Sequence, residues 1–491
     1  MSKHSVYFHD DAYITLRYAR TFVETGLIQW NPGEWAEGYT SFLHVVVLSW
    51  FMRLGFTAIA AAQLVNAIAA FVLLVMTAVS AHAVLPGREN WLGRALTVLT
   101  VASSTPIALW VLGGLEAVVV AAFLASGLAA LLTYLRWPHF GLLVLAALAY
   151  SLAVLTRLDA SVFIAGSGLG LLVASSEARR TRLIAAVIVV GIPAAVSFIQ
   201  MGIRWQIYGE LFPLTFYAKT DLPLSEKLVN GIGYLGRVMI LVPTLGIALV
   251  VAGFMWRRAQ LSMAVKFLLS ATILQLLYIC WAGGDHMPWA RMLVPLIAPL
   301  ALLLLASVSM MALRTRNTVI AASALAALVV ALAEPPKLRD RAAHFGEIIG
   351  HHINSTWPEG ITIALNTAGS TPFVAGQNRT FIDMLGLNDP IIAKRRNVPL
   401  LTERQNWPGH AKGDGAYVLS RAPDRIIVGP AHGVDVSEAW FLSGKELELL
   451  PEFARCYQRV VEPVYYSEEL AKLGDDAPNP LRFLYYTRVC P

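Results

Sequence analysis

The sequence predicts a polytopic α-helical membrane protein with a soluble α/β domain at its C-terminal end. The first observation is composition: of the 491 residues, 56% are hydrophobic and 14% are charged, and the mean hydropathy is +0.59. Soluble domains carry about 25% charged residues, so a membrane protein is expected. The second observation is a series of apolar runs separated by short basic loops. The third is a polar region that begins after Pro335-Pro336.

Ten apolar runs are predicted to span the membrane as helices. An eleventh, residues 41–55, is too short, since about 20 residues are needed to cross a bilayer. Trp50 and Arg53 at its far end favour a helix that lies at the membrane interface. The ten predicted spans are residues 57–84, 94–112, 117–135, 140–155, 161–175, 183–203, 231–255, 263–281, 291–313 and 318–333.

The arginines between these spans fall on alternate loops. Short arginine-rich loops stay in the cytoplasm, so these loops are predicted to be cytoplasmic. They contain Arg88 and Arg94, Arg136, Arg179, Arg180 and Arg182, Arg257 and Arg258, and Arg314 and Arg316. The opposite side receives the N-terminal segment, residues 113–116, 157–159, 204–230 and 283–291, and the C-terminal domain. The net charge of +6 is therefore explained by loop placement, and nucleic-acid binding is excluded.

Three regions are predicted from this map. Residues 1–56 form an external first loop with interfacial helices, 57–334 form the transmembrane helical domain, and 335–491 form an extracytoplasmic α/β domain. The N-terminal segment is predicted to lie outside although only nine residues precede Asp10. We therefore expect a first span to be missing before it.

The C-terminal region is predicted to be a compact domain of strands and helices. Residues 360–365 and 425–429 are apolar runs bounded by Gly and Pro, typical of buried strands. Residues 338–353 and 443–457 are predicted helices. Cys456 and Cys490 lie on the side that is oxidising, where a disulfide is expected. Cys280 lies in an apolar run, and the three cysteines have no metal-binding spacing.

The first loop contains two adjacent carboxylates, Asp10 and Asp11. Because neighbours on a helix point about 100° apart, one carboxylate can face an acceptor hydroxyl while the other orients it or holds a divalent cation. Asp is a common general base when it reaches the hydroxyl. The surrounding Arg17, Glu37 and Tyr39 suit sugars and phosphates. The alternative interpretation is a helix N-terminus, where acids are favoured.

Two further polar groups lie at span ends on the same predicted side. Glu116 follows two glycines, and it is either a sugar contact or a helix N-terminal acid. Arg157 and Asp159 form either part of a site or a simple ion pair. Both interpretations stay open for each group.

The last two candidates for donor binding are loops. In the loop 204–219, Tyr217 and Lys219 are candidates, because Lys binds phosphate as a point charge; the alternative is an interfacial anchor. The motif GGDHMPWAR supplies Asp285, His286 and Arg291, and Arg binds phosphate bidentately. Asp285 and His286 alone are too few for a zinc site. Metal binding is left undetermined, and no cofactor beyond a cation at Asp10 and Asp11 is considered.

These motifs carry a family resemblance that covers nearly the whole chain. They read DDAYITLRYARTFVETGLIQWNPGEWAEGYTSFL, GGLE, TRLDA, YGELFPLTFYAK and GGDHMPWARMLVPL, with FIDMLGLNDPIIAKR and GDGAYVLSRAPD in the C-terminal region. The chain thereby resembles GT-C polyprenyl-phosphate-sugar glycosyltransferases, most closely the terminal β-arabinofuranosyltransferases of mycobacterial arabinan and their relatives. The resemblance implies a multi-span fold, a lipid-linked sugar donor and a catalytic Asp at Asp10 or Asp11.

Two classes of function are compatible with the sequence. The first is an enzyme of the cell membrane that transfers a sugar, such as arabinofuranose, from polyprenyl phosphate to a glycan or glycoconjugate at the external side. The second is a transporter of lipid-linked sugars or polar solutes. Transporters tend to have internal repeats and polar residues near the midplane of their spans. Here the polar residues gather at span ends, which favours the enzyme. A surface binding protein, the third alternative, would leave the acids at the membrane edge unexplained.

Overall fold

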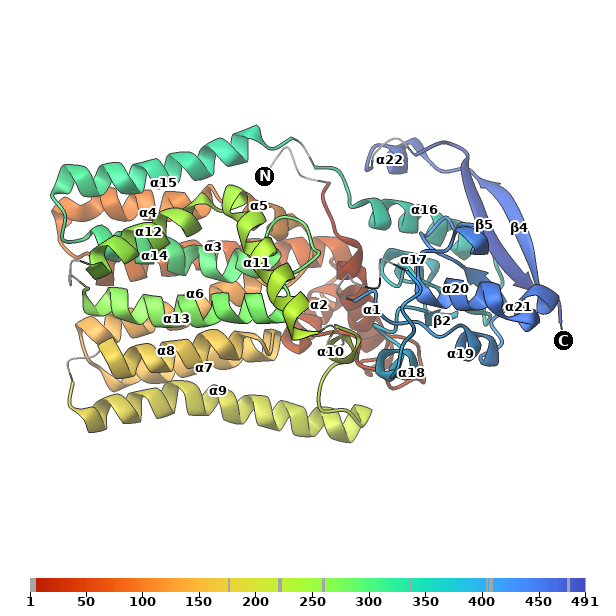
Figure 1. The fold of residues 1–491 in the computed structure, drawn as a ribbon, viewed down its shortest axis with the longest axis horizontal. Helices are drawn as coiled ribbons and strands as arrows, with labels where there is room; N and C mark the ends of the chain where they lie inside the picture. The colour runs from red at the N-terminus through yellow and green to blue at the C-terminus, as the bar shows by residue number, and fades with distance from the viewer. Residues whose placement is uncertain are drawn as a thin grey trace. The chain divides into compact units, whose positions relative to one another are not determined.

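The structure, a computed structural model, describes residues 6–174, 177–219, 223–257, 261–335, 337–402, 405, 409–474 and 477–490, without the side chain of Lys219. The chain forms two compact units (Figure 1), and each is described by itself. The first unit comprises Ala62–Met201 and Pro223–Pro336. The second comprises Ser2–Ala61, Gly202–Leu222 and Lys337–Pro491.

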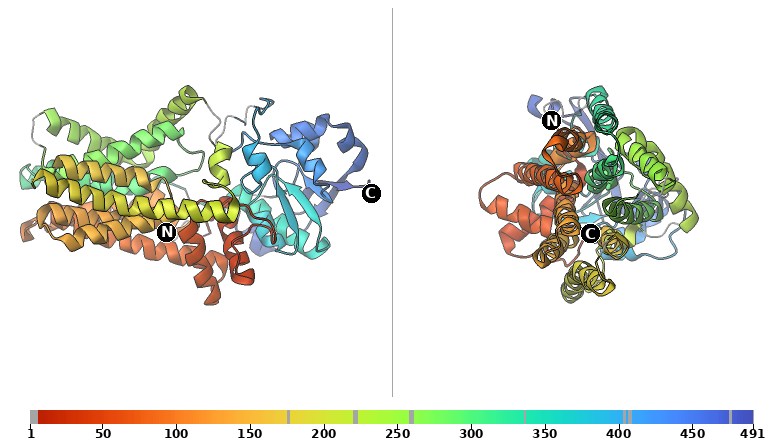
Figure 2. Two further views of the ribbon diagram at one scale, coloured as in Figure 1. Left: turned by 90° about the horizontal axis from the view of Figure 1, so that it is seen from below. Right: turned by 90° about the vertical axis from the view of Figure 1, so that its left-hand side faces the viewer.

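The first unit is a bundle of apolar helices that run side by side, as the end-on view in Figure 2 shows. Helix α3 (Ala58–Val84) begins in the second unit, and helix α9 (Arg179–Tyr208) ends there. The remaining elements are η2 (Arg88–Asn90), α4 (Trp91–Ala102), α5 (Thr105–Leu112), α6 (Ala117–Arg136), α7 (Phe140–Thr156), α8 (Ala160–Ala174), α11 (Leu224–Leu241), α12 (Pro243–Arg257), α13 (Met263–Ala282), η3 (Arg291–Leu296), α14 (Ile297–Val308) and α15 (Leu313–Ala333).

The membrane class predicted from composition is confirmed. Among the described residues, six helices are long and apolar enough to cross a membrane, and the number rises to eight if two bent pairs each form one span. Helices α7 and α8 are apolar but have only 17 and 15 residues. Each of the ten predicted spans therefore corresponds to helix, although not every helix has the length of a full span.

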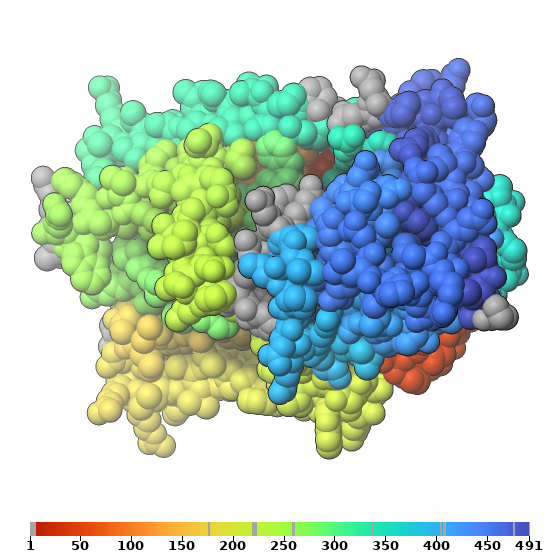
Figure 3. All heavy atoms as spheres, turned by 45° about the vertical axis from the view of Figure 1, so that its right-hand side comes forward, coloured from red at the N-terminus to blue at the C-terminus, as the bar shows by residue number. Residues whose placement is uncertain are grey.

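The predicted continuous span over residues 231–255 is broken in the structure. Helices α11 and α12 meet at an angle of 103°. Pro243 has no backbone N–H and disfavours helical geometry at the preceding residue, and Val242 accordingly has φ −128° and ψ 70°. Helix α11 lies on the surface of the first unit (Figure 3), with Val229, Ile232 and Ile240 strongly exposed.

The positive-inside pattern leads to a topology prediction. A cysteine introduced at Arg180 should react from the cytoplasmic side, and one introduced at Leu449 should react from the outside, because arginine-rich loops remain inside. Both positions are exposed. The measurement is labelling of oriented vesicles with a membrane-impermeant maleimide in a Cys280→Ser background. Labelling of both positions from the same side would refute the map.

The second unit is built around a five-stranded sheet with the order β2-β1-β3-β5-β4. Strand β1 pairs in parallel with β2 and β3, whereas β5 pairs antiparallel with β3 and β4. In register, Ile363 lies opposite Phe381 on one side and Arg425 on the other. The strands are β1 (Thr362–Leu365), β2 (Thr380–Asp383), β3 (Arg425–Ile427), β4 (Tyr457–Val464) and β5 (Leu481–Arg488).

Short helices surround this sheet. The predicted strands at 360–365 and 425–429 and the predicted helix at 338–353 are confirmed. The predicted helix over 443–457 is interrupted at Pro451 and ends at Cys456, after which β4 begins. The helices are α16 (Arg341–Thr356), α17 (Ser370–Ala375), α18 (Pro390–Lys394), α19 (Gly415–Ser420), η5 (Val436–Glu438), α20 (Leu442–Leu449), α21 (Pro451–Cys456) and α22 (Glu468–Ala471).

The two cysteines of the C-terminal region, Cys456 and Cys490, are joined by a disulfide. The bond links the end of α21 to the residues after β5, so it closes one end of the antiparallel pair β4 and β5. The apolar core beneath it includes Ile426, Val428 and Leu484, all fully or almost fully buried.

The second unit also contains segments that are distant in sequence from the sheet. These are α1 (Asp10–Thr25), α2 (Phe42–Arg53) and α10 (Leu214–Lys219). Residues 1–56 and 335–491 are predicted as separate regions, whereas the structure groups them in one compact unit. Helix α2 has 12 residues, a length of about 18 Å, which is shorter than a membrane span. Its placement at the membrane interface remains a prediction.

Candidate active site

Helix α1 carries the acid pair in its first turn. His9 is the N-cap residue, and its Nδ1 accepts a hydrogen bond from the backbone N–H of Asp11 at 3.2 Å. Asp10 and Asp11 follow directly, where the positive end of the helix dipole favours carboxylates. The helix ends at Gly26, which has φ +76° and donates its backbone N–H to Phe22 O. The caps therefore explain why this segment is helical from Asp10 onwards.

The Asp10 carboxylate is held in place by the C-terminal domain. Its Oδ1 accepts hydrogen bonds from the backbone N–H of Ser370 at 2.8 Å and from Ser370 Oγ at 2.6 Å. The Asp10 backbone N–H donates to Asp340 Oδ2 at 3.4 Å. Gly369 is required here, because a Cβ at that position would lie 2.5 Å from Asp10 Oδ2. Within the described residues, no hydrogen bond to Oδ2 is formed.

Burial changes the acidity of Asp10. The residue is 8% exposed, and burial raises the pKa of its carboxyl from 3.8 to about 6. The two hydrogen bonds from Ser370 oppose this rise, while the negative charges of Asp340 and Asp11 add to it. A carboxylate with a pKa near 6 is ionised at neutral pH and is still basic enough to accept a proton. Asp11 is only partly buried.

Arg17, predicted to bind substrate, is instead fully occupied by protein groups. Its guanidinium donates to the carbonyl oxygens of Trp30 at 2.7 Å and of Pro372 at 2.5 Å, with further bonds to Gly376 and Arg379. Burial lowers the pKa of Arg17 to about 9, so it remains charged at neutral pH. Arg17 therefore ties α1 to α17 and the chain that follows it, and we assign it no substrate contact.

The Arg17 contacts give a stability prediction. Arg17→Ala should lower the free energy of unfolding by about 3 kcal/mol or more, because several buried carbonyl groups would lose their donor. Thermal unfolding of the purified protein measures the effect. Arg20→Ala is the matched control: Arg20 is partly exposed and donates to Phe373 O. An equal loss in both variants would contradict the assignment.

Glu37 and Tyr39 belong to a buried network with the end of α9. Glu37 forms an ion pair with Arg204, and both side chains are almost completely buried. Tyr39 Oη lies 3.2 Å from the hydroxyl of Tyr208, which itself donates to the carbonyl oxygen of Ile28. These contacts fix the first loop, so its two predicted binding residues serve packing in this structure.

The loop 204–219 supplies the remaining candidates of the second unit. Tyr217 is partly buried and packs against Ala36, Leu214 and Ala393. Lys219 is the last residue of α10, and its side chain lies outside the described residues. Its predicted role in phosphate binding therefore stays a prediction.

The first unit brings Glu116 together with the pair Arg157 and Asp159. Arg157 donates from Nε and Nη2 to the two carboxylate oxygens of Asp159, at 2.9 and 3.0 Å. Its Nη1 donates to Glu116 Oε1 at 2.7 Å. The sequence allows either a simple ion pair or a site, and the structure shows an Arg that bridges two acids from different helix ends.

Arg291 lies in the same part of the first unit. Its Nε and Nη2 contact Asp285 Oδ2 at 2.8 and 2.7 Å, and His286 Nδ1 lies 3.7 Å from Asp285 Oδ1. Trp289 and Ala290 precede it with φ values of +60° and +52°. Such conformations cost about 1–3 kcal/mol in residues other than glycine and concentrate at functional sites. The backbone of GGDHMPWAR is thus held in a strained conformation directly before Arg291.

A small cavity connects these groups. Its lining includes Arg157, Asp159, Gln275 and Arg291, and its volume is about 30 Å³, enough for one or two water molecules. Gln275 Oε1 is buried and has no hydrogen-bond partner within the described residues. We call Glu116, Arg157, Asp159, Asp285 and Arg291 the charged cluster. The motifs GGLE, TRLDA and GGDHMPWAR therefore converge in space.

The described residues contain no group of three or more His, Cys, Asp or Glu side chains arranged to hold a metal ion. For the acid pair, this means that Asp10, Asp11 and their neighbours do not form such a group. The cation considered at Asp10 and Asp11 receives no support from the geometry.

The chain is similar in fold to solved structures of ArnT. ArnT from Cupriavidus metallidurans bound to undecaprenyl phosphate aligns with 99% of this chain and 95% of its own, at 13% identity and a TM-score of 0.60. The apo form of that protein aligns over the same shares, at 14% identity and a TM-score of 0.54. The chain has the GT-C glycosyltransferase fold. The low identity means that this likeness concerns the fold, not the sugar or the acceptor.

Comparisons of sequence are less informative. Residues 337–474 match the model of a domain of unknown function (DUF8728). No curated protein matches the chain in sequence. The GT-C fold implied by the motifs is thus confirmed by structure, whereas the arabinofuranosyltransferase resemblance remains a prediction.

Two residues that surround the acid pair, Ser370 and Asp340, are not predicted from the sequence. A weak signal exists for Ser370, because Gly369-Ser370 follows a buried strand and begins a helix, a pattern whose free N–H groups donate hydrogen bonds to anions. No signal in the sequence connects that pattern to Asp10, which is 360 positions away.

Proposed function

We propose that this chain is a membrane glycosyltransferase that moves a sugar from a polyprenyl-phosphate donor to a hydroxyl group of a cell-envelope glycan or glycoconjugate. The observation that carries the proposal is the Asp10 carboxylate, buried and oriented by Ser370 in a chain with the GT-C fold. A buried carboxyl group with a raised pKa is typical of a functional site.

Asp10 acts as the general base in this proposal. It takes the proton of the acceptor hydroxyl while the hydroxyl oxygen attacks the anomeric carbon of the donor. A new carbon–oxygen bond forms, and the bond between the anomeric carbon and the phosphate oxygen breaks. The electron pair of that bond leaves with the polyprenyl phosphate. Ser370 positions the base, and Asp11, which is more exposed, orients the substrate.

The charged cluster of the first unit is the proposed binding site for the phosphate of the polyprenyl donor. Arg157 and Arg291 are its two cations, and guanidinium groups stabilise phosphate through paired hydrogen bonds. Both arginines are held by carboxylates here, at 2.7–3.0 Å. We infer that the phosphate competes with Asp285 for Arg291, while the bidentate pair with Asp159 keeps Arg157 fixed.

The lipid part of the donor and the identity of its sugar rest on different observations. A polyprenyl phosphate is supported by the similarity to ArnT, whose structure holds undecaprenyl phosphate. A pentofuranose such as arabinofuranose is supported only by the sequence motifs. The acceptor is proposed to enter from the external side of the membrane. This is the side opposite the arginine-rich loops, which are predicted to be cytoplasmic.

Mass spectrometry of lipid extracted from the purified protein tests the donor class. We expect a polyprenyl phosphate, with or without sugar, to be enriched over the membrane lipids. The lipid should be depleted when Arg291 is replaced by Gln, because the phosphate loses its cation. Enrichment that is equal in both proteins would contradict phosphate binding at Arg291, and no enrichment in either would contradict a polyprenyl donor.

A further inference from the structure

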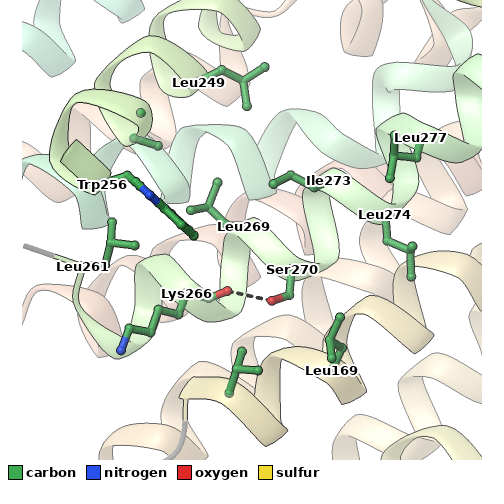
Figure 4. Close-up of a pocket in the computed structure, with 13 residues that line it drawn as sticks. Leu169, Leu249, Trp256, Leu261, Lys266, Leu269, Ser270, Ile273, Leu274 and Leu277 are labelled. Atoms are coloured by element: carbon green, nitrogen blue, oxygen red, sulfur yellow. Dashed lines mark hydrogen bonds between the residues drawn. The ribbon is translucent and has the colours of Figure 1, made fainter. Parts of the chain in front are cut away.

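An apolar groove lies on the first unit, away from the charged cluster. Its volume is about 820 Å³, and helices α8, α12 and α13 line it (Figure 4). Nine of the thirteen lining residues have aliphatic side chains. They are Leu169, Val173, Leu249, Ala252, Gly253, Trp256, Leu261, Lys266, Leu269, Ser270, Ile273, Leu274 and Leu277.

Close packing of two helices explains why the groove exists. Helix α8 approaches α13 through glycines: a Cβ at Gly166 would lie 2.7 Å from Ala271 Cα, and one at Gly170 would lie 2.6 Å from the Phe267 ring. Helix α12 does not close over this pair. A Cβ at Gly253, on α12 in the lining, would meet no atom within 4 Å. The groove therefore follows α13 from Lys266 to Leu277.

The polar features of the groove gather at one end. Lys266 and Trp256 lie there beside Leu261, and Figure 4 shows the Trp256 indole leaning over the groove towards Leu269. Among the described residues that line the groove none is acidic, and no described carboxylate forms an ion pair with Lys266. Arg257 is the next residue after Trp256 and is exposed. A Trp and a Lys together are typical of the level of lipid headgroups.

The length of the groove matches one leaflet. Lys266 and Leu277 are 11 positions apart on α13, which is about 16 Å at 1.5 Å per residue. Half of a hydrocarbon core of about 30 Å is about 15 Å. The groove thus fits the acyl chain of a phospholipid in one leaflet. It is too short for a lipid tail that crosses the bilayer.

We propose that this groove binds a phospholipid with an anionic headgroup, in the leaflet next to the arginine-rich loops, with its phosphate at Lys266 and one acyl chain along α13. This site differs from the proposed donor site, since α13 runs for 20 residues, about 30 Å, between Met263 and the loop that contains Asp285. The occupant is a structural lipid, and it is not consumed by the reaction.

Native mass spectrometry of the full chain in detergent, with added phosphatidylglycerol or phosphatidylcholine, tests the site. The wild type should retain phosphatidylglycerol about fivefold better than phosphatidylcholine, the preference expected from one basic residue. Lys266→Gln should abolish that preference. Gly253→Leu should reduce retention of both lipids, because the leucine fills the groove without disturbing the helix.

Two matched controls separate this site from general effects. Arg88→Gln removes an exposed charge on a loop assigned to the same side, and Gly246→Leu adds the same bulk on α12, where a Cβ also meets nothing within 4 Å. Neither should change lipid retention. Equal retention of the two lipids by the wild type, or an unchanged preference in Lys266→Gln, would overturn the proposal. Self-association that Gly253→Leu abolishes would also overturn it, because the occupant would then be a second copy of the chain.

Discussion

Asp10→Asn should reduce sugar transfer by about 10² or more, the usual scale for the loss of an acid–base group. The same substitution should make the protein more stable at pH 7. Asn keeps the shape of the side chain and can still accept the hydrogen bonds of Ser370, but it carries no charge that must be buried. Loss of turnover together with a gain in stability distinguishes a functional acid from a structural one.

The sign of the stability effect follows from the pKa. Because the pKa of Asp10 is raised from 3.8 to about 6, the folded state holds a proton that the unfolded chain has already released. The free energy of unfolding therefore falls as the pH rises from about 4 to about 6, and it stays lower above that. Replacing Asp10 by Asn should recover up to about 3 kcal/mol at pH 7. Turnover of the wild type should fall as the pH drops through about 6.

Asp383→Asn is the matched control. Asp383 is fully buried, and burial raises the pKa of its carboxyl to about 6 as well. It accepts hydrogen bonds from Leu385 and Asn388 within its own turn, and we assign it no part in the reaction. The folded Asp383 variant should keep its turnover. Near-full turnover in the Asp10 variant, measured with purified folded protein, would show that the acid pair on α1 takes no part in the reaction.

Arg291→Gln should weaken the binding of polyprenyl phosphate at least tenfold. A guanidinium hydrogen bond to phosphate contributes roughly 1.5–3 kcal/mol, and each 1.4 kcal/mol is a factor of ten in affinity. The affinity for the acceptor should change little. Titration of the purified protein with polyprenyl phosphate in detergent measures the effect.

Arg136→Gln is the control for charge in this experiment, since Arg136 is exposed on a loop assigned to the opposite side. Its affinity for the lipid should match that of the wild type. Asp285 loses its partner in Arg291→Gln, so thermal unfolding must show that the variant is folded. An unchanged affinity of the folded Arg291 variant for polyprenyl phosphate would contradict the assignment of the phosphate to the charged cluster.

Much of the fold could be predicted because it depends on local patterns. Apolar runs of sufficient length identify the helices of the first unit, and runs bounded by Gly and Pro identify β1 and β3. The break between α11 and α12 was missed, although Pro243 is visible in the sequence. Hydropathy is averaged over the whole run, so it does not register the single residue Pro243, which cannot donate a backbone hydrogen bond.

The surroundings of the acid pair could not be predicted, because they depend on contacts between distant segments. Asp10 meets Ser370 across 360 positions, and Arg17 meets the carbonyl of Pro372 across 355. Residue type alone indicated that Arg17, Glu37 and Tyr39 suit a substrate. The fold uses Arg17 to hold α1 against the C-terminal domain, and it uses Glu37 and Tyr39 to hold the first loop against the end of α9. Asp10 combines burial, a raised pKa and a carboxylate oxygen to which no described group donates.

The most direct test of sugar transfer is a product analysis. Purified protein in vesicles is given polyprenyl-phosphate-linked sugar and a glycan acceptor, and mass spectrometry measures the extended acceptor and the released polyprenyl phosphate. We expect the two products in equal amounts from the wild type, and a loss of both in Asp10→Asn. Appearance of the intact sugar-lipid in the opposite leaflet, with no extended acceptor, would contradict the enzyme and support a transporter of lipid-linked sugars.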